Sequence, residues 1–283
     1  MHRSLPKLCL SLSVAAVASA GLSATAHAQG DNGFLRGEGK TDISFNYSYE
    51  KFSRFWVGDD KVHDPAIGKV YRESYNFWAA YGLRDDLDLV AQASIVRADT
   101  TGNPRMRDHS ALQDGVFGAK WRVFDQRLGP GSFTIAATPA VKIPLSHYEA
   151  NAVTALGDGQ IDFRFRGVAQ YQLDCGAYLA VETGYDVRMG GTPNQYPINV
   201  SLGATVFDRL TVTPFIEYMN SEGSDDIGQV DFPDVEEDYY RWGIGTYLRL
   251  NEHIGVTAGY KATIDGKNTG DSWSYWAGIV FKI

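Results

Sequence analysis

Residues 161–187 read IDFRFRGVAQYQLDCGAYLAVETGYDV. Alternate residues from Ile161 to Leu173 are apolar or small, and most residues between them are charged or polar. After the turn at 174–176 the alternation resumes and continues to Val187. A period of two across a short turn predicts a β-hairpin with one apolar face and one polar face.

The same pattern recurs on both sides of this hairpin. Further alternating segments are centred near residues 46, 78, 91, 120, 138, 202, 214, 244, 258 and 278. Together they predict an all-β chain of about twelve strands, most of them about ten residues long or more. Strands of soluble proteins are commonly about five or six residues long, whereas a tilted strand that crosses a bilayer needs roughly 9–11. Strand length therefore favours a membrane.

The connections alternate between short and long. Short turns are expected near residues 84, 128, 175, 208 and 252, and longer links richer in Asp, Gly and Asn at 53–69, 99–112, 145–157, 189–196, 220–238 and 264–272. Bacterial outer-membrane barrels have short periplasmic turns and long outer loops. The pattern predicts a transmembrane, antiparallel, up-and-down β-barrel, closed because an open sheet edge in hydrocarbon leaves backbone groups unpaired.

Composition agrees with this interpretation. Of 283 residues 30 are Gly, aromatic residues make up 13%, and the formal net charge is -8. Many glycines and aromatics favour strands joined by tight turns over a helical bundle. The negative charge argues against a nucleic-acid partner, which needs a basic surface.

The first 28 residues are expected to be a signal peptide. Arg3 and Lys7 precede an apolar stretch too short to span a bilayer, and Ala26 and Ala28 stand where a signal peptidase requires small residues. Residues 29–283 then form one outer-membrane barrel domain. Cleavage leaves Cys175 as the only cysteine, which excludes an intramolecular disulfide and a CxxC zinc site.

Several segments resemble the outer-membrane barrel family named for the meta-pathway of phenol degradation. They are the hairpin at residues 81–89 (YGLRDDLDL), the strand at 118–122 (GAKWR), Lys142-Ile143-Pro144, and the loop sequence LGDG at 156–159. The resemblance implies an outer-membrane transporter of small, including aromatic, compounds, without catalytic residues or a cofactor. The aromatic last strand resembles the signal read by the barrel assembly machinery, although the terminal residue is Ile283 and not Phe.

The polar faces of the strands are expected to line the lumen. The candidates for solute contact are Arg72, Lys120, Arg122, Arg164, Arg166, Glu182, Asp186 and Arg241. Such residues form a charged constriction in other pores. Alternatively they pair across neighbouring strands and only fill the barrel. The aromatic residues Trp56, Tyr148, Tyr196, Tyr239, Tyr240 and Trp273 fall near predicted strand ends, where an aromatic girdle lies in barrels of this kind.

Other classes of protein remain open at this stage. A soluble β-sandwich or lipocalin-like barrel would also show a period of two, but with shorter strands. An adhesive or structural barrel would share the membrane fold. An outer-membrane lipid hydrolase needs a Ser/His pair, for which Ser146-His147, His109-Ser110 and His63 are the candidates, although adjacency in sequence does not make side chains converge. No metal site is expected. The oligomeric state is not predicted.

Overall fold

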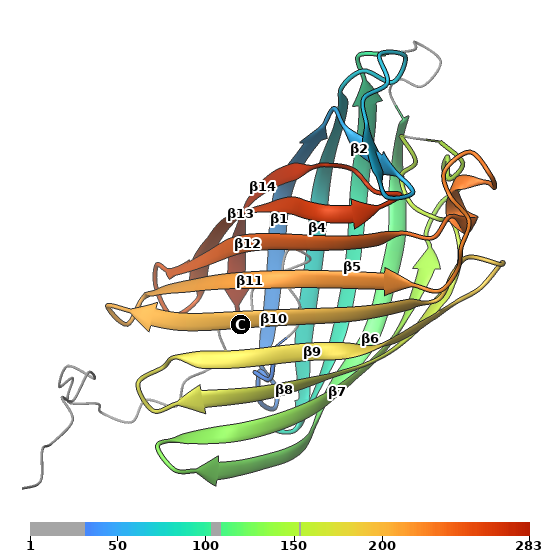
Figure 1. Ribbon diagram of the computed structural model, residues 1–283. Coiled ribbons are helices and arrows are strands. Elements are labelled where there is room, and N and C mark those ends of the chain that lie inside the picture. Colours follow the sequence, from blue (N-terminus) through green and yellow to red (C-terminus); the bar gives the residue numbers. More distant parts are fainter. Residues whose placement is uncertain (1–31, 103–108, 153) are drawn as a thin grey trace, which may run out of the picture.

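The computed structural model describes residues 32–102, 109–152 and 154–283, and these form one closed β-barrel (Figure 1). The prediction for residues 1–28 lies outside the described residues, so the signal peptide stays a prediction. The strands of the barrel are β1 (Thr41–Phe52), β4 (Val70–Arg84), β5 (Leu87–Thr100), β6 (His109–Leu128), β7 (Gly131–Pro144), β8 (Asp162–Leu173), β9 (Tyr178–Arg188), β10 (Gln195–Val206), β11 (Leu210–Ser221), β12 (Asp238–Arg249), β13 (Ile254–Lys267) and β14 (Trp273–Lys282).

Each barrel strand is antiparallel to the strands that precede and follow it in the barrel. The first and last strands close the ring, with Asp42 opposite Lys282 and Lys51 opposite Trp273. Backbone hydrogen bonds between Thr41 and Ile283 complete this seam. The predicted up-and-down barrel of about twelve strands is confirmed. Closure matters because it leaves no sheet edge with unpaired N–H and C=O groups.

The two ends of the barrel differ. Short turns join β4 to β5, β6 to β7, β8 to β9, β10 to β11 and β12 to β13, and the chain enters and leaves the barrel at this same turn end. Longer links gather at the opposite, loop end (Figure 1). Two of them carry small elements that the sequence did not indicate, the hairpin β2 (Phe55–Val57) with β3 (Asp60–Val62) and the 3-10 helix η2 (Phe232–Asp234). In the described ranges, no helix is long and apolar enough to cross a bilayer.

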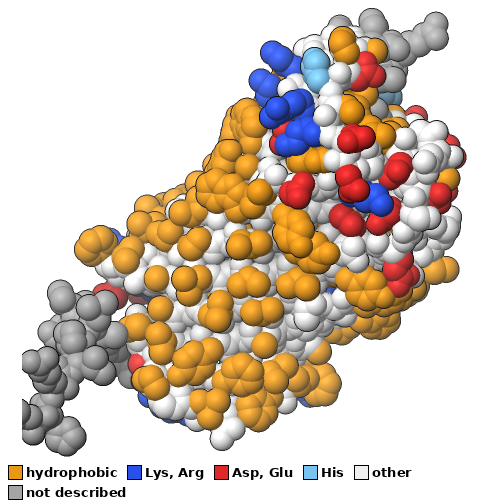
Figure 2. All heavy atoms as spheres, viewed as in Figure 1, with side chains coloured by type: hydrophobic (Ala, Val, Ile, Leu, Met, Phe, Trp, Pro, Cys, Tyr) orange, Lys and Arg blue, Asp and Glu red, His pale blue; other side chains and the backbone are white. Residues whose placement is uncertain are grey.

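The apolar face of each strand points outward. Phe45, Tyr75 and Phe165 are 51%, 59% and 60% exposed, whereas Ser44, Glu182 and Asp186 are buried inside the ring. Figure 2 shows apolar side chains spread over the wall of the barrel, while charged side chains gather around the loop end. A soluble barrel buries its apolar face, so this inverted distribution requires hydrocarbon around the wall. Cross-strand ring pairs on this face, such as Phe45 with Phe77 and Tyr47 with Tyr75, add to its packing.

Candidate functional site

The barrel encloses a cavity of about 710 Å³ that is lined by side chains from most of the strands and by the links of the loop end. The charged side chains on its wall come from β1, β4, β6, β7, β8, β9, β11, β12 and β13 and from the links. They include seven of the residues expected from the sequence to face the lumen: Arg72, Lys120, Arg164, Arg166, Glu182, Asp186 and Arg241. Their contact with a solute stays a prediction, but the structure brings them to one space.

Arg122 does not line this cavity, and its expected contact with a solute stays a prediction. Strand β5 begins only at Leu87, which lies opposite Trp121, and Arg122 is therefore at the rim of the turn end. Its guanidinium donates to the carbonyl of Asp85 at 2.7 Å and lies 3.7 Å from the carboxylate of Asp125. A register irregularity between Arg122 and Phe124 follows. Alternation within β6 cannot show at which residue the neighbouring strand β5 begins.

Strands β8 and β9 hold a compact charge network that closes one side of the cavity. Arg166 donates through Nε to Asp186 Oδ1 at 2.9 Å, through a second nitrogen to Asp186 Oδ2, and through a third to Glu182 Oε1 at 3.2 Å. Asn199 of β10 also donates to Glu182, at 3.2 Å. Arg166 is thus paired as cross-strand neighbours should be, which supports the alternative that part of the lumen charge fills the barrel.

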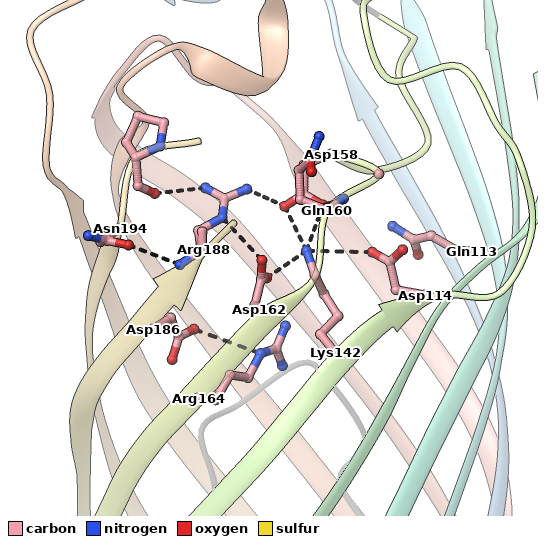
Figure 3. Close-up of polar contacts among 12 residues, drawn as sticks. Gln113, Asp114, Lys142, Asp158, Gln160, Asp162, Arg164, Asp186, Arg188 and Asn194 are labelled. Carbon is pink, nitrogen blue, oxygen red and sulfur yellow. Dashed lines mark hydrogen bonds and ion pairs between the residues drawn. The ribbon is translucent and has the colours of Figure 1, made fainter. Parts of the chain in front are cut away.

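A second cluster, the loop clasp, ties the link 145–161 to the wall. It consists of Lys142, Asp114, Asp158, Asp162 and Arg188 (Figure 3). Lys142 Nζ lies 2.6 Å from Asp158 and 2.6 Å from Asp162, and 3.7 Å from Asp114. Arg188 also bonds Asp158. Since all five side chains are nearly buried, their charges interact with little screening by water.

Further hydrogen bonds seat the same link over the cavity. Tyr148 donates its hydroxyl to Asp114 and accepts the N–H of Gly159 at 3.0 Å. Arg72 of β4 reaches across to the carbonyl of Ala155 at 2.8 Å. Burial, together with the hydrogen bond to Asp114, raises the pKa of Tyr148, so its hydroxyl stays protonated and remains a donor. The described parts of the link, 145–152 and 154–161, are therefore held as a cover on the loop end.

The clasp should open in acid. Burial alone would raise the pKa of Asp158, but Lys142 and Arg188 outweigh it and lower that pKa to about 2. A carboxyl whose pKa is lower in the folded state stabilises the fold fully at a pH above its pKa in the unfolded chain, about 3.9. This stabilisation is lost as the pH falls through the pKa of the folded state. We expect the link to be anchored at pH 5–7 and released between about pH 4 and pH 2.

A spin label measures this release. The label is attached to Ala152→Cys in a Cys175→Ser background, and its mobility is recorded from pH 7 to pH 2. The variant Asp158→Asn is the control and should be mobile over the whole range. A mobility midpoint at or above pH 4 would contradict the paired state of Asp158.

The segment 32–38, before the first strand, crosses the lumen near the turn end. Gly33 N–H donates to Gln170 of β8 at 2.9 Å, and the ring of Phe34 meets that of Tyr178 on β9 edge-on at 5.2 Å. Arg36 N–H lies 3.0 and 3.2 Å from the two carboxylate oxygens of Asp88 on β5. Its guanidinium pairs with Asp42 of β1 at 3.1 Å. Strands β9 and β1 lie six places apart in the ring, so the segment spans its diameter.

Glycine at position 82 allows this crossing. A Cβ atom built there would lie 1.9 Å from the carbonyl oxygen of Gly37, a distance that no side chain tolerates. The backbones of Gly39 and Lys40 also bond that of Gly82, at 2.8 and 2.9 Å. The sequence patterns do not indicate that residues 32–38 lie inside the barrel. The contact that places this segment, Arg36 N–H with Asp88, joins residues 52 positions apart, and alternation along the chain cannot show it.

The expected aromatic girdle needs a correction at three positions, of which one is Tyr148, whose hydroxyl bonds Asp114 in the link over the cavity. Tyr239 lies inside, with the guanidinium carbon of Arg241 3.6 Å from its ring centre, and Trp56 is buried beneath Lys61 at the loop end. Tyr196, Tyr240 and Trp273 are exposed on the outer face. Tyr239 shares the inward face with Arg241 because both have the same parity on β12.

The described residues assemble no metal site, and two of the hydrolase candidates, Ser146 and His63, bond to loop backbone. Within 32–102, 109–152 and 154–283, no three His, Cys, Asp or Glu side chains are placed to hold a metal ion. Ser146 donates its hydroxyl to the carbonyl of Leu112 at 2.6 Å, and His63 contacts the carbonyl of Ser53 at 2.6 Å. Both contacts are made to backbone carbonyls of the loop end. Neither one is the contact between a nucleophile and its base.

Comparison with known proteins agrees with this architecture. A family model described as "Putative MetA-pathway of phenol degradation" matches residues 32–279. No curated protein matches the sequence. Among solved structures, the chain is similar to the COG4313 outer membrane channel from Pseudomonas putida F1, with 13% identity, a TM-score of 0.73, and coverage of 90% of this chain and 98% of that one.

Two further structures are more distant. The translocator domain of the autotransporter NalP from Neisseria meningitidis is 11% identical, with a TM-score of 0.50 and coverage of 87% and 88%. The NanC porin is 9% identical, with a TM-score of 0.51 and coverage of 86% and 100%. At these identities the likeness shows the fold, which is that of bacterial outer-membrane barrels.

Proposed function

Because the chain belongs to the family described as the MetA-pathway of phenol degradation, we propose that it is an outer-membrane channel for small solutes, aromatic compounds among them. The turn end then faces the periplasm, as short turns do in this class of barrel. The observation that carries the proposal is the cavity of about 710 Å³ inside a barrel whose outer wall is apolar. The neighbours in the comparison are named as a channel, a translocator domain and a porin.

The lining of the cavity is complementary to solutes that have both an apolar body and polar groups. Its apolar side chains include Phe52, Trp78, Leu156 and Met219, and Tyr239 presents a ring beside the charged wall. Binding sites for small molecules commonly combine such apolar surfaces with a few well-placed polar groups. A wide water-filled porin would lack this apolar component.

Single-channel recording tests the proposal. The refolded barrel in a planar bilayer is expected to give stepwise currents of low conductance, because the link 145–161 and the segment 32–38 narrow the lumen. Folding is checked by the shift in gel mobility on boiling. Protein that is folded yet electrically silent at high load would refute the channel and favour the structural or adhesive barrel. Cleavage of lipid by the same protein would favour the hydrolase.

A further inference from the structure

Two arginines of the cavity keep hydrogen-bonding capacity that the barrel does not use. An arginine has five N–H donors. Among the described side chains, Arg164 forms one ion pair, with Asp186, and its Nε lies 3.8 Å from Asp186 Oδ2. This distance is too long for a hydrogen bond, so Nε has no hydrogen-bond partner within the described ranges. Both oxygens of Asp186 already accept from Arg166. Figure 3 shows the Arg164 guanidinium with no other interaction drawn to it.

Arg241 is in a similar state on the other side of the cavity. The face of its guanidinium lies on the ring of Tyr239, and its hydrogen bond to a described side chain is a long one, 3.4 Å from Nε to the hydroxyl of Thr263. The carboxylates that act on it electrostatically have other partners: Glu50 pairs with Arg72, Glu217 with Lys261, and Glu237 with Thr269. A ring on the face of a guanidinium leaves its edge, where the N–H groups point, open to a ligand.

The other cavity cations differ from these two. Lys142 and Arg188 are bound within the loop clasp, Arg166 holds Asp186 and Glu182, and Lys261 holds Glu217. Arg72 is engaged by Glu50 and by the carbonyl of Ala155. In the part of the chain that the structure describes, the Nε atoms of Arg72 and Arg188 also lack a hydrogen-bond partner, but other nitrogens of these two guanidiniums have close acceptors, whereas Arg164 and Arg241 have only long contacts. A buried donor without an acceptor, such as Arg164 Nε, is costly, which favours a ligand that supplies acceptor oxygens.

We infer that the cavity binds small organic carboxylates, with the carboxylate accepting from Arg164 or Arg241 and the apolar body lying against Tyr239 and the apolar wall. This rests on the proposed channel function and names its solute class. Carboxylates suit the site because their two oxygens match the fork of a guanidinium. A neutral aromatic would leave these donors unsatisfied, and an aromatic amine would be repelled by them.

Blockade of the single-channel current tests this inference, with three probes of similar size. Benzoate, benzyl alcohol and benzylamine are added to the wild-type barrel, and the concentration that halves the current is measured for each. Benzoate is expected to act at a concentration about tenfold lower than the other two, as for one charge-assisted hydrogen-bond pair. Equal potency of the three probes would overturn the inference.

Variants locate the site. Arg164→Gln and Arg241→Gln are each expected to weaken blockade by benzoate about tenfold, with little change for benzyl alcohol. Arg164→Lys keeps the charge but loses the fork, and should be intermediate. Arg122→Gln is the matched control, because it removes the same charge outside the cavity. Unchanged blockade by benzoate in both Gln variants would overturn the assignment.

The outcomes separate this inference from the proposed function. Absence of current in the folded wild-type barrel refutes the channel itself. Current without preferential blockade by benzoate refutes only the carboxylate site. Should a Gln variant fail to fold, the comparison of the three probes on the wild-type barrel still tests whether the cavity prefers a carboxylate.

Discussion

Deleting residues 32–38 is expected to raise the single-channel conductance severalfold. The segment crosses the lumen from β9 to β1 and buries Arg36 against Asp88 and Asp42. Because it lies across the diameter near the turn end, its removal leaves a wider path through the barrel. The loss should be tolerated by the wall, since the ladder from β1 to β14 does not use these residues.

Two point variants sharpen this prediction. Gly82→Ala places a methyl group against the carbonyl of Gly37 and should displace the segment, raising conductance without any deletion. Glu38→Ala is the control, because the Glu38 side chain is exposed and only its backbone N–H is bonded, to Asp85. Conductance that is unchanged in both the deletion and Gly82→Ala would show that the narrow point lies elsewhere.

Replacing Lys142 by Met is expected to lower the free energy of unfolding by about 3–5 kcal/mol. Lys142 is the cation that Asp114, Asp158 and Asp162 share, and its side chain is only 8% exposed. Without it, Asp158 and Asp162 keep Arg188 as their ion-pair partner in the described part of the chain, and Asp114 keeps only the hydrogen bond from Tyr148. Truncating one partner of a buried charge network leaves the others desolvated and unpaired, which costs far more than a surface pair contributes.

Urea unfolding of the barrel in lipid or detergent, followed by gel mobility, measures the change. Lys61→Met is the matched control, since Lys61 is exposed and its partner Asp271 keeps Arg54 at 2.9 Å; its effect should stay within about 1 kcal/mol. Lys142→Arg should recover part of the loss by restoring the charge. Equal destabilisation by Lys142→Met and Lys61→Met would contradict the clasp.

Alternation was sufficient for the fold because the barrel is a direct physical consequence of it. Each strand such as 162–173 must place one face in hydrocarbon, and antiparallel neighbours joined by short turns pair in chain order. The strand number, the closed topology and the inward face of seven of the eight candidate residues follow from this rule. Arg122 does not line the cavity, because it lies beyond the start of β5, which the rule cannot locate.

The contents of the lumen depend on contacts that no local pattern contains. The docking of Arg36 on Asp88 spans 52 positions, and that of Gly33 on Gln170 spans 137. The roles of the glycines also depend on contacts between strands that the sequence pattern does not contain. Composition suggested tight turns, yet Gly259 lies within β13, where an added Cβ would be 2.0 Å from the ring of Trp276. Inward aromatic rings of this barrel require facing glycines, a relation between strands that a single-strand pattern cannot show.

The most direct test of the account asks whether the current passes through the polar face. Asn199 lines the cavity, whereas its neighbour Val200 is exposed on the outer wall. Asn199→Cys and Val200→Cys, each in a Cys175→Ser background, are recorded in planar bilayers before and after addition of a bulky, water-soluble thiol reagent. We expect the reagent to reduce the stepwise current through Asn199→Cys and to leave that through Val200→Cys unchanged. A reduction in Val200→Cys but not in Asn199→Cys would contradict a solute path through the barrel.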